Sequence, residues 1–465
     1  MMSFWTGIAA ALSLLALASC TGSPELVRRP VGPPSAVLIE DVSVLDVVSG
    51  YSTAHRDVLV EDGRIAYIVA TGKSELPPGG KRIDGRGSTL LPGLVDMHAH
   101  VAAPSAPPWI AGFPDEDANL QAFLYAGVTT ILGTGDLAAN AFARRDRIAR
   151  GDQLGPTNYE AGPIVTVTGG HPVAIFSQTL PWFLRWYVIP RLARQVDTPQ
   201  EARVAAAEIA GMNADVMKVV VDRLPPQAPR IPNDVLAAAI AEARRHDLRT
   251  VAHIGTAQDA IDAAQAGVAA WVHGVYKEPL SDEQVEKLAS FGIPMAPTLV
   301  VFDAFASFGQ PFEPSRLEQE TVDPAVLAAM NEVPEDFDLS FAKDHDRRRE
   351  FNRENVRRLH AAGVTMLAGS DTQGGVFAGA SLHREIALLV EAGLTPAEAI
   401  RAATIDPARF LSRSNTPDFG VVAEGARADL LLVEGDPTED VANLARIRAV
   451  LKNGVLLERT PLPKN

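Results

Sequence analysis

Residues 91–100 read LPGLVDMHAH, and this stretch decides the fold class. A short apolar run ends in two histidines, His98 and His100, that are separated by one residue. Because side chains alternate in direction along a β-strand, both imidazoles point to the same face, as two ligands of one metal must. A single strand histidine is more often an ordinary core or surface residue, so this interpretation depends on the rest of the chain.

Seven more β-rich stretches follow, each succeeded by Ala-, Leu-, Glu- and Arg-rich sequence of helical period. The eight predicted strands cover residues 91–100, 127–135, 163–170, 214–222, 248–255, 269–275, 293–301 and 363–371. Eight β-then-α units in a row are the number that closes a (β/α)8 barrel, whereas a doubly wound open sheet rarely has so many. We therefore predict an α/β protein with a TIM barrel.

Both ends of the chain show short apolar alternations interrupted by turn residues. Residues 36–90 and 417–465 share this texture, and Asn453-Gly454 is a typical hairpin turn. Neither end alone makes a sheet with a buried face, so we expect one small β-sandwich assembled from both termini. The predicted organisation is a signal peptide (1–20), a tether (21–35), the N-terminal part of the sandwich (36–90), the barrel (91–416) and the C-terminal part of the sandwich (417–465).

The first 20 residues, MMSFWTGIAAALSLLALASC, end in the only cysteine of the chain, Cys20, which excludes an internal disulfide. Small residues directly before a lone cysteine resemble the bacterial lipoprotein signal, although no Lys or Arg precedes the apolar run. That resemblance implies export and a lipid on Cys20 that holds the protein at the outer membrane, in the periplasm or at the cell surface. A plain signal peptide that is simply cleaved is the alternative.

The composition limits the kind of partner. Hydrophobic residues make up 47% and charged residues 21% of the chain, which is ordinary for a folded enzyme. The formal net charge is -15, and a surface this acidic repels phosphate backbones, so we expect no nucleic-acid partner. We expect a small-molecule substrate, and contact with a membrane only through the N-terminal lipid anchor. A homo-oligomer is one of the oligomeric states that the sequence allows.

Polar residues also end or occupy other predicted strands, on the side where barrels carry their active sites. These residues are Lys218, His253, His273 and Asp371. Imidazoles and a carboxylate suit a divalent metal of borderline hardness, zinc above all, with manganese, cobalt or iron as alternatives. Such a metal lowers the pKa of bound water to about 7. Asp371 is then both a ligand and the candidate catalytic proton shuttle.

Four of these strand ends together are similar to the amidohydrolase superfamily: HAH (98–100), VAHIGT (251–256), WVHG (271–274) and AGSDT (368–372). The segments TPAEAIRAATIDPARFL and ARADLLLVEGDP match as well, so the resemblance covers roughly residues 36–460. Within the superfamily the chain most resembles the imidazolonepropionase-like and Xaa-Pro dipeptidase-like branch. The resemblance implies a metal-dependent hydrolase of amide, peptide or cyclic amide bonds. Deaminases of this fold carry HxxE after the fifth strand, and here Thr256 stands in place of that Glu.

The state of Lys218 distinguishes a site with two metals from a site with one. In several branches of the superfamily the fourth-strand lysine is carbamylated and bridges two metals. The resemblance therefore implies two Zn²⁺ per chain, held by His98, His100, Lys218, His253, His273 and Asp371. Alternatively, an unmodified Lys218 pairs with an acid such as Asp222, and the site is mononuclear, as in an imidazolonepropionase-like, lactone or organophosphate hydrolase. A surface lipoprotein that binds a metal or ligand without catalysis is a third hypothesis.

Other residues are candidates for substrate contact. By resemblance, His171 contacts the carbonyl or carboxylate of the substrate and counts as catalytic, and Tyr276 is a weaker substrate-binding candidate. Lys277, Asp136 and Arg223 could also reach the pocket. The chain departs from the dipeptidase-like pattern after the second strand, where GTGD stands in place of an Arg-Asp pair. Because such loops shape the pocket, the resemblance does not specify the substrate.

Overall fold

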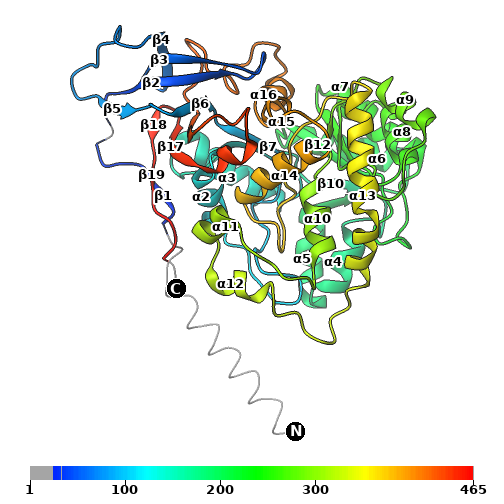
Figure 1. The fold of residues 1–465 in the computed structure, drawn as a ribbon. Coiled ribbons are helices and arrows are strands. Elements are labelled where there is room, and N and C mark those ends of the chain that lie inside the picture. The colour runs from blue at the N-terminus through cyan, green and yellow to red at the C-terminus, as the bar shows by residue number, and fades with distance from the viewer. Residues whose placement is uncertain (1–24, 33, 464–465) are drawn as a thin grey trace.

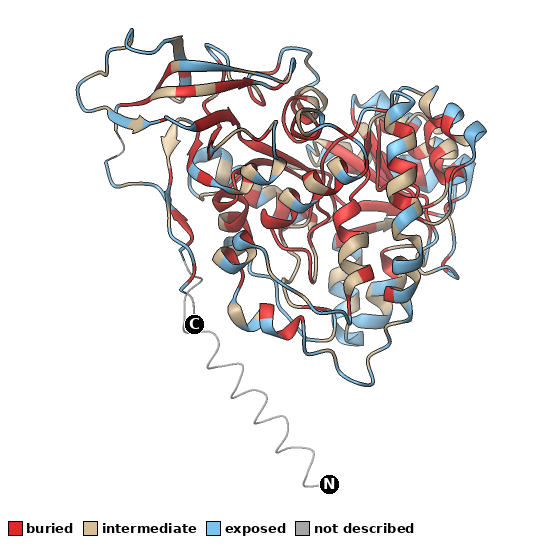
Figure 2. Ribbon diagram, in the orientation of Figure 1, coloured by how far each residue is buried: buried red, intermediate tan, exposed pale blue. Residues whose placement is uncertain are grey.

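The computed structural model describes residues 25–32 and 34–463 of the chain. It has a mixed α/β architecture in which parallel strands and their helices form the body (Figure 1). A separate sheet built from both ends of the chain lies beside this body. The strands inside the body are largely buried, and the outer helices expose one face (Figure 2).

The parallel strands of the body belong to two sheets. One has three strands in the order β7-β8-β9, and the other has six in the order β11-β10-β12-β13-β14-β15. The bounds are β7 Leu94–Ala99, β8 Val128–Gly133, β9 Thr157–Glu160, β10 Ile164–Thr166, β11 Ala193–Gln195, β12 Val216–Val220, β13 Arg249–His253, β14 Ala270–Val272 and β15 Met295–Ala296.

Backbone hydrogen bonds outside these ladders join the two sheets on both sides. On one side the amide of Asp215, just before β12, donates to the carbonyl of Glu160 at 2.9 Å. On the other side the segment around residues 366–368 lies between β15 and β7. Its bonds run from Leu367 N to Met295 O at 2.8 Å and from Met97 N to Ala368 O at 2.9 Å. These bonds satisfy backbone groups that would otherwise be buried without partners.

Two of the predicted strands differ from the structure, and strand β9 was not predicted. The stretch 293–301 is a strand only at β15, because Thr298 adopts a left-handed backbone with φ 50° and helix α10 begins at Leu299. The stretch 363–371 forms a single parallel bridge, from Met366 to Met295. Strand β9 was missed because Asn158 and Glu160 are polar yet buried, so it lacks an apolar alternation.

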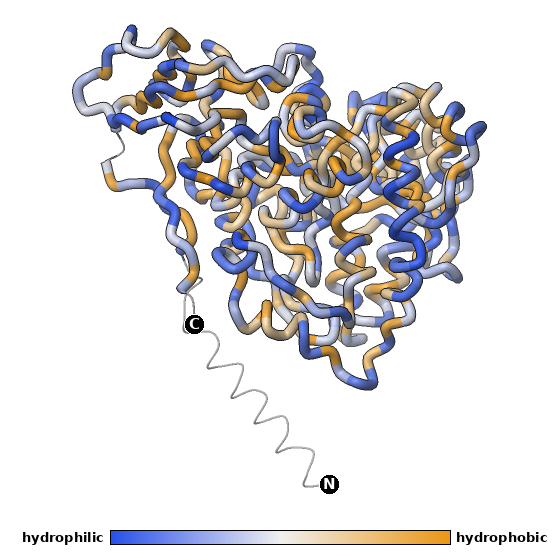
Figure 3. The backbone as a smooth tube through the Cα atoms, in the orientation of Figure 1, coloured by the Kyte–Doolittle hydropathy of each residue, from blue (hydrophilic) through white to orange (hydrophobic). Residues whose placement is uncertain are grey.

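Helices follow the strands and cover the body. Their bounds are α2 Glu116–Tyr125, α3 Ala138–Arg150, α4 Val173–Thr179, α5 Trp182–Leu192, α6 Pro199–Gly211, α7 Asn233–Arg245, α8 Ala257–Ala266, α9 Asp282–Ala289, α10 Leu299–Ser307, α11 Arg316–Thr321, α12 Pro324–Ala329, α13 Ser340–Ala361, α14 Ala380–Glu391, α15 Pro396–Ala402 and α16 Ile405–Ser412. Capping boxes at Thr198, Thr256 and Ser281 satisfy the first amides of α6, α8 and α9. The outer helix α13 is mostly hydrophilic (Figure 3).

Strands from both ends of the chain form one mixed sheet of eight strands, in the order β18-β17-β16-β6-β2-β3-β4 with β5 paired to β2. The two ends meet where β6 and β16 pair antiparallel, from Leu430 opposite Pro92 to Glu434 opposite Ser88. The bounds are β2 Ala36–Asp46, β3 Tyr51–Glu61, β4 Arg64–Ala70, β5 Lys81–Asp84, β6 Ser88–Pro92, β16 Leu430–Glu434, β17 Ile447–Lys452 and β18 Val455–Leu456. A short 3-10 helix, Val441–Ala445, precedes β17.

The chain enters the body within the range predicted as a tether. Strand β1 (Val27–Arg28) pairs antiparallel with β19 (Glu458–Arg459), and Leu26 and Val27 are buried. This part of the range 21–35 is therefore packed against the body. The predicted signal peptide and Cys20 lie outside the described residues. Of the residues described, none forms a helix with the length and apolar character needed to cross a membrane.

Candidate active site

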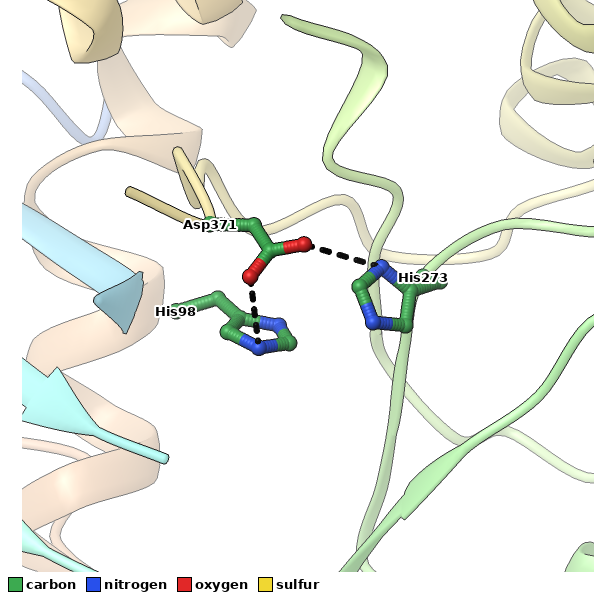
Figure 4. Close-up of side chains that lie close together, drawn as sticks. All are labelled: His98, His273 and Asp371. Carbon is green, nitrogen blue, oxygen red and sulfur yellow. Dashed lines mark ion pairs between the residues drawn. The ribbon is translucent and has the colours of Figure 1, made fainter. Parts of the chain in front are cut away.

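Three buried side chains from distant parts of the chain meet at one point (Figure 4). His98 comes from β7, His273 directly follows β14, and Asp371 follows the segment that lies between β15 and β7. Asp371 Oδ1 lies 3.4 Å from His98 Nε2, and its Oδ2 lies 4.0 Å from His273 Nδ1. One donor atom from each of the three lies within 4.8 Å of the others, a spacing that one metal ion can bridge.

His100 joins the same carboxylate. Its Nε2 lies 3.0 Å from Asp371 Oδ1, so both histidines of the HAH motif face one oxygen, as the strand alternation predicts. The backbone holds this arrangement, because the Asp371 amide donates to the His98 carbonyl at 2.6 Å and the His100 amide donates to the Thr372 hydroxyl at 2.7 Å. Asp96, buried under the site, accepts the amides of His98 and Ser370.

Lys218 reaches the cluster from β12. Its Nζ lies 3.1 Å from His98 Nε2, and the residue is 3% exposed. Burial lowers the pKa of Lys218 to about 8, although Asp371 opposes that shift. The alternative in which Lys218 pairs with Asp222 does not match the geometry. Asp222 accepts instead from the Tyr276 hydroxyl at 2.7 Å and from Lys277 Nζ at 2.5 Å.

His253 and His171 extend the cluster away from Asp371. The rings of His253 and His273 are 4.2 Å apart between centroids, and those of His171 and His253 are 4.8 Å apart. Within the described part of the chain, the buried Nε2 of His253 makes no hydrogen bond, although Asp222 Oδ2 lies 3.4 Å away. A buried nitrogen without a hydrogen bond is costly in a finished core, and a metal would satisfy it.

The charge states in the site are those that metal ligands require. Burial lowers the pKa of His253 to about 4 and that of His171 to about 3, so both imidazoles are neutral at neutral pH. Burial also holds the pKa values of His98 and His273 well below the ordinary range. Burial by itself would raise the pKa of Asp371, but its contacts with His98, His100 and His273 together lower that pKa, so the carboxylate is ionised. Neutral imidazoles and an ionised carboxylate fit a divalent cation.

The backbone is strained at this site. His273, Thr298 and Asp371 adopt positive φ angles of 72°, 50° and 54°. Non-glycine residues rarely take this conformation, and a β-branched residue such as Thr298 does so least often. This conformation of Thr298 orients the His273 ring, because the Thr298 Oγ1 lies 2.7 Å from His273 Nδ1. An Nδ1–H that donates to this hydroxyl leaves Nε2 of His273 unprotonated and available as a ligand.

The other predicted candidates have different surroundings. The Tyr276 hydroxyl is engaged by Asp222, and its ring stacks on Phe302 with centroids 4.1 Å apart. Asp136 accepts the amides of Val101 and Ala102, directly after the HAH motif. It therefore fixes the loop that follows β7. Arg223 takes part through its carbonyl, which accepts from Lys277.

Sequence analysis missed several residues that support the site: Asp96, Arg144 and Thr298, and Asp222 in its contact with His253. The fully buried Arg144 pairs with Asp136 at 2.6 Å and Glu160 at 3.0 Å beneath the HAH loop. One of these residues carries a signal, because Asp96 precedes His98 by two positions and so shares its face of β7. The others depend on contacts between segments far apart in sequence.

The profile of the amidohydrolase family matches residues 89–457. Imidazolonepropionase of Salinispora arenicola is 28% identical over 414 residues, which cover 86% of this chain and 91% of the relative. Among solved structures, a prolidase complexed with N-methylphosphonate-L-proline has a TM-score of 0.72 and 26% identity, covering 91% of this chain and 100% of that one. A Xaa-Pro dipeptidase with bound methionine has a TM-score of 0.73 at 23% identity, covering 91% of this chain and 99% of that one, and this likeness concerns the fold.

The matched range includes every residue of the cluster, from His98 on β7 to Asp371. Amidohydrolases generally use divalent metals, and the neutral imidazoles and ionised carboxylate described above have the chemistry to bind one. Relatives from both branches, together with the match over most of the chain, favour an enzyme over a non-catalytic binding protein. This chain therefore belongs to the amidohydrolase family and is a hydrolase that acts on carbon–nitrogen bonds.

Proposed function

We propose that this amidohydrolase has a binuclear metal site with a carbamylated Lys218, and that it hydrolyses a dipeptide, an N-acyl amino acid or a cyclic amide. The observation that carries the proposal is the contact of 3.1 Å between Lys218 Nζ and His98 Nε2. It puts a buried amine among five candidate ligands: His98, His100, His253, His273 and Asp371. An unmodified ammonium there would repel a bound cation, whereas a carbamate offers two anionic oxygens.

The surroundings of Lys218 favour carbamylation. The neutral amine is the form that attacks carbon dioxide, and burial increases its population by lowering the pKa of Lys218 to about 8. The nitrogen forms a bond to the carbon of CO₂ and loses a proton to solvent, which leaves a carbamate. His98 stands next to the modified end and Asp371 lies beyond it, so both can share the same cations.

Each residue has a defined task in this proposal. When bound, the divalent metals, which we propose to be zinc, supply a hydroxide at neutral pH and polarise the scissile carbonyl. Asp371 takes the proton from the attacking water and delivers it to the leaving nitrogen as the C–N bond breaks. His171, 4.8 Å from His253 between ring centroids, is neutral and can donate a hydrogen bond to the substrate carbonyl or carboxylate. The products are an acid and an amine.

The proposed substrate class is supported by the prolidase relative, whose complex contains an N-methylphosphonate derivative of L-proline. Such a ligand presents a tetrahedral phosphonate next to the nitrogen of an amino acid, as the hydrolysis of an acyl amino acid would. The imidazolonepropionase relative supports a second candidate, the hydrolysis of a cyclic amide at a mononuclear site. The cluster of His98, His273 and Asp371 would be enough to hold one ion.

The first experiment counts metal ions per chain in protein purified with bicarbonate and without chelator. The same protein is tested on a library of dipeptides, N-acyl amino acids and cyclic amides. We expect two metal equivalents per chain and turnover of the dipeptides or N-acyl amino acids. One equivalent with turnover of cyclic amides alone would contradict the binuclear proposal and favour the second candidate. Asp371→Asn should lower kcat by about 10²–10⁴-fold while circular dichroism stays unchanged. A full kcat in this variant would contradict the role of Asp371.

We also propose that the body closes into a (β/α)8 barrel over residues 91–416 and that the terminal strands fold as a sandwich. The hydrogen bonds that join the two parallel sheets on both sides support the barrel. The pairing of β6 with β16 supports a single unit made of residues 36–90 and 417–465. We propose further that the chain is exported and anchored at the outer membrane through a lipid on Cys20.

A further inference from the structure

Helix α5 exposes an apolar surface that the fold does not use. Seven of its first eight residues, WFLRWYVI (182–189), are apolar or aromatic, yet its only buried residue is Leu192 at the end. Trp182 is 79% exposed and Trp186 is 72% exposed. A helix with this composition is normally buried in a protein or at a membrane surface. Another apolar surface is therefore expected to cover it.

The charges around α5 indicate which kind of surface covers it. Residues 171–196 contain no Asp or Glu but three arginines, in a chain whose net charge is -15. Arg194 pairs with Glu208, whereas Arg185 and Arg191 make no ion pair within the described part of the chain. In a two-fold symmetric dimer this surface would meet its own copy, so the arginines of both copies would lie opposite one another and repel. Anionic phospholipids offer negative headgroups above an apolar layer, which matches arginines beside exposed tryptophans.

The N-terminus also brings this side of the molecule towards lipid. Cys20 precedes Glu25, the first described residue, by five positions, and a chain of five residues reaches at most about 18 Å. Strand β1, which follows directly, leads from the end of the molecule at which α5 and α12 lie, the lower end in Figure 1. A lipid on Cys20 would therefore hold the lower end of the body near the bilayer.

We infer that α5 docks on the surface of an anionic phospholipid bilayer, with Trp182, Phe183, Trp186 and Tyr187 at the level of the headgroups. This inference rests on the proposed lipid anchor. Tryptophan and tyrosine rings are enriched at this depth because their bodies are apolar and their edges polar. Helix α4, which packs against α5, begins two residues after His171, so the docked surface is close in sequence to the candidate active site.

The test uses the full chain reconstituted in vesicles of phosphatidylethanolamine and phosphatidylglycerol. Acyl chains brominated near the headgroup quench nearby tryptophan fluorescence. The reporter signal is the difference between the wild type and the double variant Trp182→Phe/Trp186→Phe, which keeps the aromatic surface. We expect bromolipid to reduce this difference signal at least about twofold, because interfacial rings lie at the depth of the bromine.

The matched control adds Tyr51→Trp to the double variant. Tyr51 is 78% exposed and begins β3, which lies at the end of the molecule away from α5 in Figure 1. If the α5 signal is quenched no more than the Tyr51→Trp signal, the inference is wrong, whether or not the chain dimerises. Failure of the chain to float with the vesicles would also overturn it. Metal content and turnover of the same preparation in detergent show separately whether the proposed hydrolase function stands.

Discussion

The chemistry of Lys218 can be tested through the pH at which the metal-free protein regains activity. Metal and dissolved CO₂ are first removed from the protein. Zinc and a fixed concentration of dissolved CO₂ are then added back at a series of pH values. Burial lowers the pKa of Lys218 from 10.5 to about 8. The difference of about 2.5 units means that the neutral amine at pH 7 is about 300-fold more abundant than for an ordinary lysine.

The two pKa values predict different profiles. With a pKa of about 8, the neutral fraction rises roughly 50-fold between pH 6 and pH 8 and then less than about twofold more. An ordinary lysine would continue to rise about 80-fold between pH 8 and pH 10. We therefore expect the initial rate of reactivation to level off just above pH 8.

The assay measures the return of hydrolysis after short incubations, with every sample diluted into one common assay buffer. Carbon-13-labelled bicarbonate followed by NMR detects the carbamate itself. Lys218→Arg is the control, because its guanidinium keeps the positive charge and cannot form a carbamate at these pH values. Reactivation that ignores CO₂, continues to rise to pH 10, or occurs fully in Lys218→Arg would refute the carbamylation of Lys218.

Three other substitutions test how the fold supports the site. Thr298→Ala removes the hydroxyl 2.7 Å from His273 Nδ1 and should weaken zinc binding about 10–100-fold in a chelator titration, whereas Thr298→Ser should bind normally. Equal affinity in both variants would contradict the orienting role of Thr298. Gly255→Ala puts a Cβ about 2.6 Å from the Asp222 carboxylate. We therefore expect the free energy of unfolding in urea to fall by about 1–3 kcal/mol. An unchanged free energy would mean that Asp222 moves freely. Arg144→Met leaves the buried carboxylates of Asp136 and Glu160 without their cation, so the free energy of unfolding should fall by about 3–5 kcal/mol in the same assay. A decrease of less than about 1 kcal/mol would show that the loop after HAH does not depend on these ion pairs.

Local patterns in the sequence account for the ligand side chains. The one-residue spacing of His98 and His100 predicts that both face one point, and the structure has both next to the same oxygen of Asp371. The positions of His253 and His273 at strand ends, and of Lys218 within its strand, were likewise visible, because parallel strands present their ends on one side of the body. The family followed from these motifs taken together.

Other features could not be read from local patterns. Strand β9 was missed because Glu160 is polar yet buried, and it pairs with Arg144 on a helix that the sequence does not link to it. The eighth predicted strand proved to be a single bridge, since its pairing depends on β15 and β7 at the same time. Both errors concern segments whose environment is supplied by distant parts of the chain.

The sequence by itself determined which side chains are candidate ligands, since strand alternation and helical period are local properties. It also determined the family, through motifs that span most of the chain. Only the tertiary structure decided the partners: that Lys218 contacts His98 rather than Asp222, that Asp222 contacts Tyr276 and Lys277, and that Thr298 orients His273. The physical reason is that ion pairing, burial and the pKa values they set depend on distances between residues far apart in sequence, which folding alone establishes.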